Sequence, residues 1–303
     1  MLDLRLRSKV SAEELEAKQG KILGAVDYNV LLTGPTRVRK PDGKPLCVYL
    51  PGALREQVDD KEVYDILHSL RSLVSSNRGL ASGTPRFKGN QRTYAKNVAS
   101  AIVGAVDPQG QQKYCRLTAW TGRNLPEWQK LHPLLRAVAD QLAVHVPDRY
   151  AAQQAYADKS DPAWIVPGTP FTTITINNTY PTGVHTDKGD LDEGFSSIAC
   201  LRKGTYTGGQ LVFAEYRVAV DLQHGDLILM DAHEWHGNVA ITCRCGFELS
   251  GCCEDCGAER VSLVSYFRTK VARCGTPDEE YRKGSNYREQ VAARRSAPAE
   301  AEK

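Results

Sequence analysis

The feature that most constrains the fold is a change of hydrophobic pattern near residue 165. Beyond this point, short runs rich in β-branched residues are separated by Gly, Asp or Asn turns. Six such runs occur, namely FTTITINNT, SSIACL, GGQLVFA, YRVAVDL, DLILMD and RVSLVSYF. Runs of this length with turn residues between them predict the strands of a barrel or sandwich. We therefore expect the second half of the chain to be built around a sheet.

The first half shows helical periods instead. We expect helices over 12–20, 58–76 and 125–146, and a short strand within GKPLCVYLPGAL. Helices first and strands later indicate an α+β protein. We expect an N-terminal helical and basic-loop part over 1–165, a strand-rich core over 166–275 that carries the site, and a polar, partly disordered tail over 276–303.

Composition excludes several classes of protein. The 303 residues are 41% hydrophobic and 25% charged, which is typical of a globular chain. No apolar run approaches the roughly 18–20 residues that span a bilayer, and the first residues lack a signal-peptide pattern. The sequence therefore predicts a soluble cytoplasmic protein, which we expect to be a monomer. The formal charge of +3 is too small to indicate a nucleic-acid partner by itself.

One segment is nevertheless strongly basic. Between Asp65 and Asp107 there is no acidic residue and there are six basic ones, namely Arg71, Arg78, Arg86, Lys88, Arg92 and Lys96. A long basic loop is suited to phosphate contacts, but it is also typical of a solvated surface. Arg86, Lys88 and Arg92 are our candidates in it for contact with a phosphate-bearing substrate.

The densest chemical signal is NNTYPTGVHTDKGDLDEGF. His185 and Asp187 lie two residues apart at the end of a predicted strand, so that both side chains point to the same face. A neutral imidazole and a carboxylate on one face suit two adjacent corners of a metal octahedron. A third ligand from a distant strand would complete the facial triad of a non-haem Fe(II) oxygenase.

The third ligand is expected in GDLILMDAHEWHGNVAI, which contains His233 and His236. Strand alternation places the two histidines on opposite faces, so only one of them can join His185. We favour His236, because an apolar strand follows it. Arg260 opens the final predicted strand, where its planar guanidinium is suited to the distal carboxylate of 2-oxoglutarate. Ser262, two residues further on the same face, can donate a further hydrogen bond.

Five of the nine cysteines fall between Cys243 and Cys256. The other four, Cys47, Cys115, Cys200 and Cys274, are scattered, which is unlike a small disulfide scaffold. Thiolates of Cys243, Cys245, Cys256 and either Cys252 or Cys253 are suited to a structural zinc ion, Zn(II), with tetrahedral geometry. The alternative is a reduced, cysteine-rich hairpin without metal.

The chain resembles the TET/JBP superfamily of 2-oxoglutarate- and Fe(II)-dependent DNA dioxygenases, especially its bacteriophage-type members. The residues that carry the resemblance are GVHTDKGD, GGQLVF, VAVDLQHGDLILMDAHEWHGN and RVSLVSYF, with weaker matches at CRLTAWT and PDGKPLCVYLPGAL. The resemblance implies a double-stranded β-helix (a jelly-roll, cupin-like core) braced by the N-terminal helices. It also implies iron held by His185, Asp187 and His236, with Arg260 binding 2-oxoglutarate. For a viral member, the compartment would be the host-cell cytoplasm.

The resemblance further implies that O2 oxidises the 5-methyl group of a pyrimidine in DNA. Asp190, near the expected site, favours 5-methylcytosine over thymine, since a carboxylate accepts from the exocyclic amine of cytosine. Arg268 is a second candidate for a contact with the base. Reaching the methyl group requires base flipping or a single strand. Two alternatives remain: a dioxygenase acting on a nucleoside or a protein side chain, and a catalytically silent DNA-binding barrel.

Overall fold

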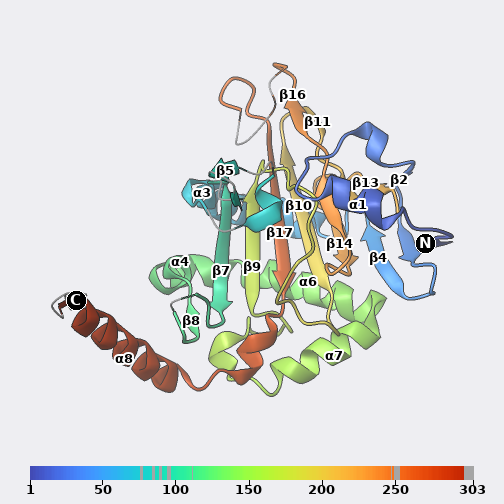
Figure 1. The fold of residues 1–303 in the computed structure, drawn as a ribbon. Helices are drawn as coiled ribbons and strands as arrows, with labels where there is room; N and C mark the ends of the chain where they lie inside the picture. The colour runs from blue at the N-terminus through green and yellow to red at the C-terminus, as the bar shows by residue number, and fades with distance from the viewer. Residues whose placement is uncertain are drawn as a thin grey trace.

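Two facing sheets and a layer of helices make up the computed structural model of the protein (Figure 1). The structure describes residues 1–75, 78–83, 86–88, 91–93, 97–110, 112–246, 248 and 253–296, and the side chains of all of these except 86–88, 91–93 and 289–296. The combination of sheets and helices confirms the predicted α+β class.

The larger sheet has nine strands among the described residues. Its order is β1 (Leu2–Arg5), β3 (Thr36–Arg39), β4 (Pro45–Leu50), β14 (Leu227–Met230), β10 (Ser196–Lys203), β17 (Glu259–Tyr266), β9 (Thr173–Asn178), β7 (Ser100–Val106) and β8 (Arg116–Leu117). The strands β10 and β17 lie at its centre and pair antiparallel over seven residues, with Cys200 opposite Ser262. This pairing places the start of β17 beside the end of β10, with Glu259 opposite Lys203.

A smaller sheet lies against it. Its order in the described residues is β15 (His236–Asn238), β12 (Leu211–Phe213), β13 (Val218–Val220) and β2 (Val30–Leu32). One hydrophobic core lies between the two sheets and includes Tyr49, Ile198, Phe213 and Met230. Two shorter pairs complete the strands: β11 (Tyr206–Gly208) with β16 (Ile241–Cys243), and β5 (Arg86–Lys88) with β6 (Gln91–Thr93).

Helices cover the other face of the larger sheet. They are α2 (Arg55–Val58), α3 (Lys61–Ser69), α4 (Ala119–Arg123), α5 (Leu125–Lys130), α6 (His132–His145) and α7 (Pro147–Ala157). A second core joins α6 to β9, β10 and β17 through Leu135, Leu142, Ile174 and Leu263. The first helix, α1 (Ala12–Lys18), begins where the Ser11 side chain accepts a hydrogen bond from the backbone N–H of Glu14.

The six strands predicted beyond residue 165 and the three predicted helical regions are confirmed, although 58–76 and 125–146 each divide into shorter helices. The expectation that strands follow helices was wrong, because β1, β3, β4, β7 and β8 all precede residue 165 and join the larger sheet. Among them, β4 pairs with β14 and β7 pairs with β9, which lie far along the chain, so the local pattern does not show that this group joins the larger sheet. The proposed division at residues 165 and 275 stays a prediction. The helix α8 (Pro277–Ser296) extends away from the body (Figure 1).

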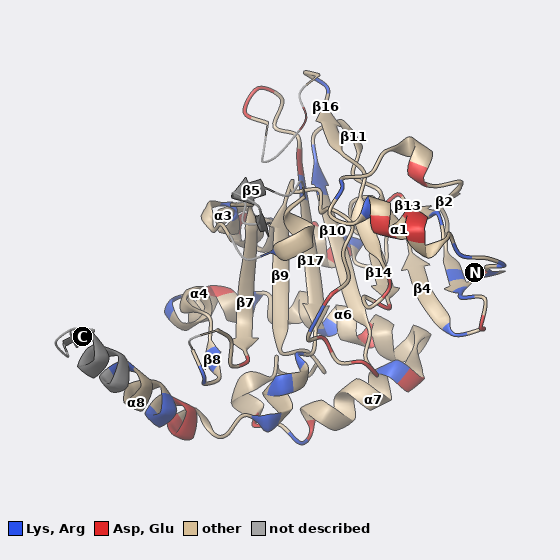
Figure 2. Ribbon diagram, in the orientation of Figure 1, with Lys and Arg blue, Asp and Glu red and all other residues tan. Residues whose placement is uncertain are grey.

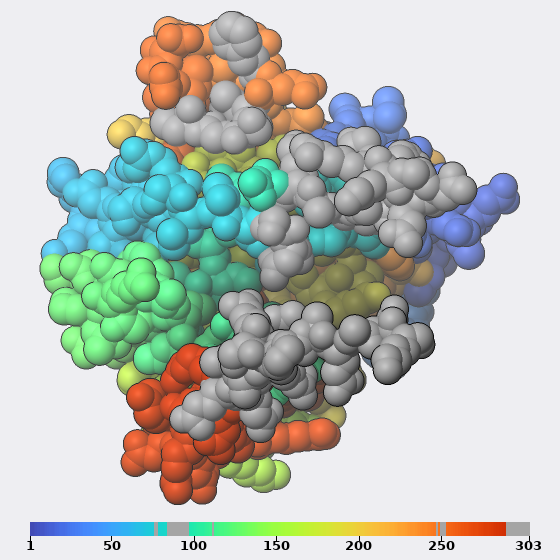
Figure 3. Space-filling view, turned by 60° about the vertical axis from the view of Figure 1, so that its left-hand side comes forward, coloured from blue at the N-terminus to red at the C-terminus, as the bar shows by residue number. Residues whose placement is uncertain are grey.

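Charged residues of both signs are spread over many elements rather than gathered on one of them (Figure 2). The orange part of the chain that includes β16 projects from one end of the molecule (Figure 3). No helix among the described residues is both long and apolar enough to cross a bilayer.

Candidate metal centre and adjoining cavity

Three side chains from distant parts of the chain converge between the two sheets. One ligand atom from each of His185, Asp187 and His236 lies within 4.8 Å of the other two. The Nε2 atom of His185 is 3.5 Å from one carboxylate oxygen of Asp187, and Nε2 of His236 is 3.8 Å from the other. We call this set the His-Asp triad. Two imidazoles and one carboxylate on one side of a point are suited to a facial set of metal ligands.

Backbone pairing brings the two histidines together. The backbone N–H of each donates to the carbonyl of the other at 2.9 Å, which makes an isolated antiparallel bridge between His185 and His236. The side chain of Asn238, on β15, accepts from the backbone and hydroxyl of Thr182 and holds the preceding loop in place. The placement of His185 at the end of a strand needs correction: β9 ends at Asn178, and the pair of ligands follows a loop.

Both imidazoles are oriented by backbone carbonyl groups. Nδ1 of His185 donates to the carbonyl of Gly183, and Nδ1 of His236 donates to the carbonyl of Glu234, each at 2.8 Å. A carbonyl oxygen can only accept, so these contacts place the hydrogen on Nδ1 and leave the Nε2 lone pair free. Such contacts set the tautomer and ring orientation of histidine ligands in metal proteins.

The protonation states also suit a cation. Burial lowers the pKa of His236 to about 4, and the charge of His185 acts in the same direction, so the His236 imidazole is neutral near pH 7. Burial opposes the ionisation of Asp187, but the neighbouring imidazoles of His185 and His236 and the guanidinium of Arg78 hold the pKa of this carboxyl well below its usual range. The triad therefore offers a neutral nitrogen donor from His236 and an ionised oxygen donor from Asp187.

The triad opens into a cavity of about 120 Å³ whose lining includes Arg260 and Ser262. Both residues lie on β17 two positions apart, and both are buried. Arg260 and Ser262 therefore share one space with the three residues of the triad, while their roles stay a prediction. Asn177, Thr182 and Asn238 add polar groups to the same lining.

The start of β17 is fixed from its other face. Glu259 has no exposed surface, and its carboxylate accepts from the Tyr64 hydroxyl, the Asn178 amide and Nδ1 of His68. Arg260 donates its backbone N–H to the Thr179 hydroxyl. The side chains of Glu259 and Arg260 point to opposite faces of the sheet, as adjacent strand residues must. The buried carboxylate thus supports the strand that presents Arg260 to the cavity.

His233 lies outside the triad. Its Nδ1 is 3.1 Å from Oδ1 of Asp231, and the other carboxylate oxygen of Asp231 accepts from Nζ of Lys40. Nζ of Lys40 also donates to the Glu234 carboxylate at 2.7 Å, so one buried cation stabilises the turn between β14 and β15. The choice of His236 over His233 as the residue that faces His185 agrees with this arrangement.

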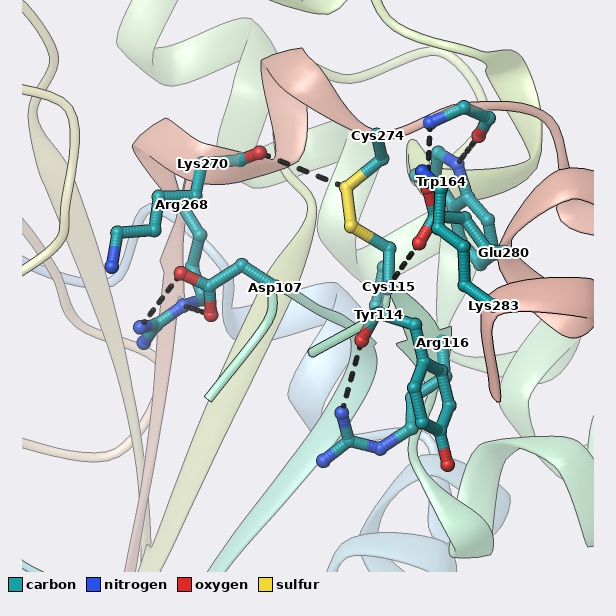
Figure 4. Close-up of a disulfide and its surroundings, with 12 residues drawn as sticks. Asp107, Tyr114, Cys115, Arg116, Trp164, Arg268, Lys270, Cys274, Glu280 and Lys283 are labelled. Carbon is teal, nitrogen blue, oxygen red and sulfur yellow. Dashed lines mark hydrogen bonds and ion pairs between the residues drawn. A yellow bond between two sulfur atoms is a disulfide. The ribbon is translucent and has the colours of Figure 1, made fainter. Parts of the chain in front are cut away.

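The two residues predicted to contact the base lie at the edge of the cavity. The Asp190 carboxylate accepts from the Ser196 hydroxyl at 2.9 Å, and burial together with the charge of Asp187 raises its pKa to about 7. The guanidinium of Arg268 makes a two-pronged ion pair with Asp107, with its Nε at 2.7 Å (Figure 4). Both residues line the cavity, but Arg268 already has an anionic partner.

The basic segment is described only in part. Arg86 and Lys88 lie in β5 and Arg92 lies in β6, while their side chains lie outside the described part of the structure. The sequence analysis did not single out Arg78, which lines the cavity beside the triad. The acid-free composition of its segment was the available signal, but composition does not distinguish one cation from its neighbours.

Four thiols form a second cluster of metal-ligating groups. The Sγ atoms of Cys243, Cys245, Cys253 and Cys256 all lie within 4.8 Å of one another, and we call this set the cysteine cluster. Of the two alternatives for the fourth thiol, Cys253 takes part, whereas Cys252 lies outside the described residues. Sγ of Cys243 and Sγ of Cys253 are 3.7 Å apart.

A disulfide between Cys115 and Cys274 was not predicted (Figure 4). It joins the end of the sheet at β8 to the 3-10 turn Thr269–Arg273 that follows β17. The two cysteines are 159 residues apart in sequence, and spacing alone offered no signal that they pair.

Comparison with known proteins identifies the family. A family model described as Tet_JBP, the oxygenase domain of the 2OGFeDO superfamily, matches residues 107–269, which is more than half of the chain. The chain belongs to this family. Its enzyme class is accordingly that of a 2-oxoglutarate- and Fe(II)-dependent dioxygenase. The bacteriophage-type subgroup stays a prediction.

Individual relatives agree with the family. The chain is 28% identical over 286 residues to a Trypanosoma brucei brucei protein named thymine dioxygenase JBP1. This match covers 93% of this chain and 31% of that protein. The chain is also 33% identical over 189 residues to the protein of that name from Crithidia fasciculata, covering 61% of this chain and 21% of the relative. The chain thus spans less than a third of the length of these relatives.

A solved structure titled NgTET1 in complex with 5mC DNA shares the fold. It has a TM-score of 0.58 and 14% sequence identity, and the match covers 91% of this chain and all of that chain. At this identity the likeness concerns the fold alone. It supports the assignment of the two facing sheets to the double-stranded β-helix architecture of this oxygenase class.

Proposed function

We propose that this protein hydroxylates the 5-methyl group of a pyrimidine in DNA, using Fe(II), 2-oxoglutarate and O2. The observation that carries the proposal is the convergence of the His-Asp triad with Arg260 and Ser262 on one buried cavity. The match to a family of oxygenase domains, relatives named thymine dioxygenase and a similar fold solved in complex with 5mC DNA support it.

The residues fit the iron and the cosubstrate. His185 and His236 present Nε2 lone pairs, Asp187 presents an ionised oxygen, and the three occupy one side of the candidate metal position. An iron ion held by these three residues would be accessible from the cavity that they line. Arg260 would hold the distal carboxylate of 2-oxoglutarate through a two-pronged contact, and the Ser262 hydroxyl would donate to the same group. When bound, iron and 2-oxoglutarate supply the oxidising power needed to break a methyl C–H bond.

The protein's own groups then position the substrate. A methyl group within a base stack cannot enter a cavity lined by buried side chains, so the nucleotide must leave its stack or come from a single strand. Asp190, at the cavity edge, would bind the exocyclic amine of cytosine, and this contact favours 5-methylcytosine, oxidised to 5-hydroxymethylcytosine. Arg268 is placed to act beside it, with Asp107 fixing its orientation.

Thymine is the second candidate base, with 5-hydroxymethyluracil as its product. The observation that favours it is the name thymine dioxygenase, which the relatives in Trypanosoma brucei brucei and Crithidia fasciculata carry. The free nucleoside and a protein side chain remain the alternatives that use the same metal centre.

Mass spectrometry of nucleosides tests both the activity and the base. The protein is incubated with iron, 2-oxoglutarate and either 5-methylcytosine DNA or unmodified DNA, which is then digested. A product heavier by one oxygen atom than 5-methyl-2′-deoxycytidine, or than thymidine, would identify the base. Reactions without 2-oxoglutarate serve as controls. Oxidation of free nucleosides with none in DNA would contradict the proposal.

We also propose that the cysteine cluster binds a structural zinc ion. Four thiolates at a Zn–S distance of about 2.3 Å form a tetrahedron with edges of about 3.8 Å, and the Cys243–Cys253 Sγ separation is 3.7 Å. The cluster packs against a small core that includes Tyr206, Ile241 and Ala258. Such a core is too small to hold the insert by itself. Elemental analysis should find one zinc per chain, and metal-free protein with four titratable thiols in this region would contradict the assignment.

A further inference from the structure

An outer hollow of about 570 Å³ adjoins the metal cavity. Arg78, His185, Asp187, Lys188 and Arg268 line both spaces, so the hollow leads directly to the triad. The inner cavity, at about 120 Å³, is small for a cosubstrate and a nucleotide together. The remainder of a bound nucleotide must therefore lie in the outer hollow.

The lining of the hollow is cationic and partly aromatic. It contains Arg78, Lys188 and Arg268, together with the indole of Trp235 and the amide of Gln109. Among the described residues, Asp187 is the only acidic group in the lining, and it belongs to the triad. Arg268 is neutralised by Asp107. The free positive charge of the hollow thus comes from Arg78 and Lys188.

The Nε atom of Arg78 has no acceptor among the described residues. This atom is buried, and the guanidinium makes no ion pair within the described part of the chain. Leaving a buried cationic N–H without an acceptor is unfavourable, and an anion that bridges Nε and Nη would remove this cost. Lys188 is exposed on the loop next to Asp187 and is also without an ion-pair partner among those residues.

We propose that Arg78 and Lys188 bind the phosphodiester beside the target nucleotide, so that the outer hollow holds the DNA strand while the base enters the inner cavity. This inference rests on the proposed function. A carboxylate of 2-oxoglutarate is the other oxyanion that reaches this region, but Arg260 and Ser262 already offer it donors in the inner cavity. A phosphodiester suits the two-pronged guanidinium of Arg78, and Trp235 offers a face on which a neighbouring base can stack.

The test compares Arg78→Gln, Lys188→Gln and the double variant with Lys159→Gln, a control that removes an exposed cation after α7, away from the hollow. Binding of a 5-methylcytosine oligonucleotide is followed by fluorescence anisotropy over a range of salt concentrations. Each single variant should reduce the slope of log Kd against log salt by about 0.7–0.9, and Arg78→Gln should weaken binding by about tenfold at low salt. Lys159→Gln should leave the slope unchanged.

Three further measurements keep the test decisive. Arg78→Lys retains the positive charge and should restore most of the salt slope. Iron binding is measured for every variant in parallel, so that a variant that has lost its fold is recognised by its loss of iron affinity. The KM for 2-oxoglutarate, followed as succinate release without DNA, should not change. A raised KM with an unchanged salt slope would assign Arg78 to the cosubstrate and overturn the proposal.

Failure of the Arg78 and Lys188 proposal can be distinguished from failure of the proposed function. If the wild-type protein oxidises no pyrimidine in any DNA, the proposed function fails. If the wild-type protein oxidises DNA and the Arg78 and Lys188 variants bind it with the wild-type salt slope, only the present inference fails.

Discussion

The His-Asp triad and the cysteine cluster are both sets of metal-ligating side chains, but the fold supports them differently. The triad lies between two sheets, and its imidazoles are oriented by the carbonyl groups of Gly183 and Glu234. The cysteine cluster lies on a projecting insert, with Cys245 exposed and Cys256 partly exposed (Figure 3). A site that the fold holds in place can leave coordination positions open for chemistry, whereas four thiols on a small insert suit a closed structural site.

This difference separates activity from stability. Loss of a triad ligand should remove activity and leave the fold largely intact, because two cores on either side of the larger sheet hold the strands. Loss of a cluster ligand should affect the insert and leave the reaction largely intact.

The largest effect is expected for His236→Ala. Removing a partner of a metal ligand typically costs 10–100-fold, so removing a ligand itself should lower turnover by more than about 100-fold. His233→Ala is the matched control, since His233 contacts Asp231 rather than the triad and should retain most of the activity. Succinate release and iron binding are measured for both. Activity that survives in His236→Ala but is lost in His233→Ala would reverse the ligand assignment and break the comparison.

The disulfide is a second sulfur site, and we expect it to stabilise the fold independently of the cysteine cluster. The disulfide Cys115–Cys274 closes a loop of 159 residues, and its loss through Cys274→Ser should lower the free energy of unfolding by about 2–5 kcal/mol. Urea unfolding with and without reductant measures this. Reductant should destabilise the wild-type protein and have little further effect on the variant, while the zinc content of both stays the same. A loss of zinc in Cys274→Ser would show that the two sulfur sites are not independent.

The triad was predictable from the sequence because its ligands carry strong local signals. His185 and Asp187 are two residues apart, and His236 begins a short strand after an apolar run. Arg260 and Ser262 were likewise placed by alternation on one strand. Local period and spacing are enough to predict which side chains share a face when those residues are neighbours in sequence.

The remaining features depend on contacts between segments that are far apart. The parallel pairing of β1 with β3 and the disulfide between Cys115 and Cys274 bring together segments that no local pattern connects. Arg78 was one of six cations in a segment without acids, and only the fold shows that it lines the cavity. In the cysteine cluster, spacing left Cys252 and Cys253 as equal alternatives.

A smaller effect is expected at the support of β17. Glu259→Gln replaces a buried carboxylate that accepts three hydrogen bonds, so one donor must face the new NH2 group, and we expect a loss of about 2–3 kcal/mol near neutral pH. Burial opposes ionisation of Glu259, but hydrogen bonds from Tyr64, Asn178 and His68 lower its pKa below the ordinary value of 4.5. Its contribution is therefore present above pH 4.5 and is lost as the pH falls through the lower, folded-state pKa.

Urea unfolding at several pH values checks the direction in which the stabilising contribution of Glu259 changes with pH. The gap in stability between wild-type protein and Glu259→Gln should be constant above about pH 5.5 and narrow below pH 4.5. Glu16→Gln is a control, because this carboxylate is exposed on α1 and makes no hydrogen bond or ion pair within the described part of the chain. A gap that widens on acidification would show that Glu259 is protonated in the folded protein. Its neighbour Arg260 would then be supported by packing alone.

The smallest effect on activity is expected in the cysteine cluster, where two adjacent thiols allow a direct comparison. Cys253→Ser should lose the bound zinc, because a hydroxyl replaces one of four thiolates, whereas Cys252→Ser should retain it. Turnover should stay within about threefold of wild type in both, since substitutions away from the reacting groups usually change free energies by less than about 0.5 kcal/mol. Zinc content, proteolysis of the insert and succinate release are measured together. If Cys253→Ser lost turnover to the same degree as His236→Ala, the cluster would be part of the active site, and the separation of a reactive centre from a structural one would not hold.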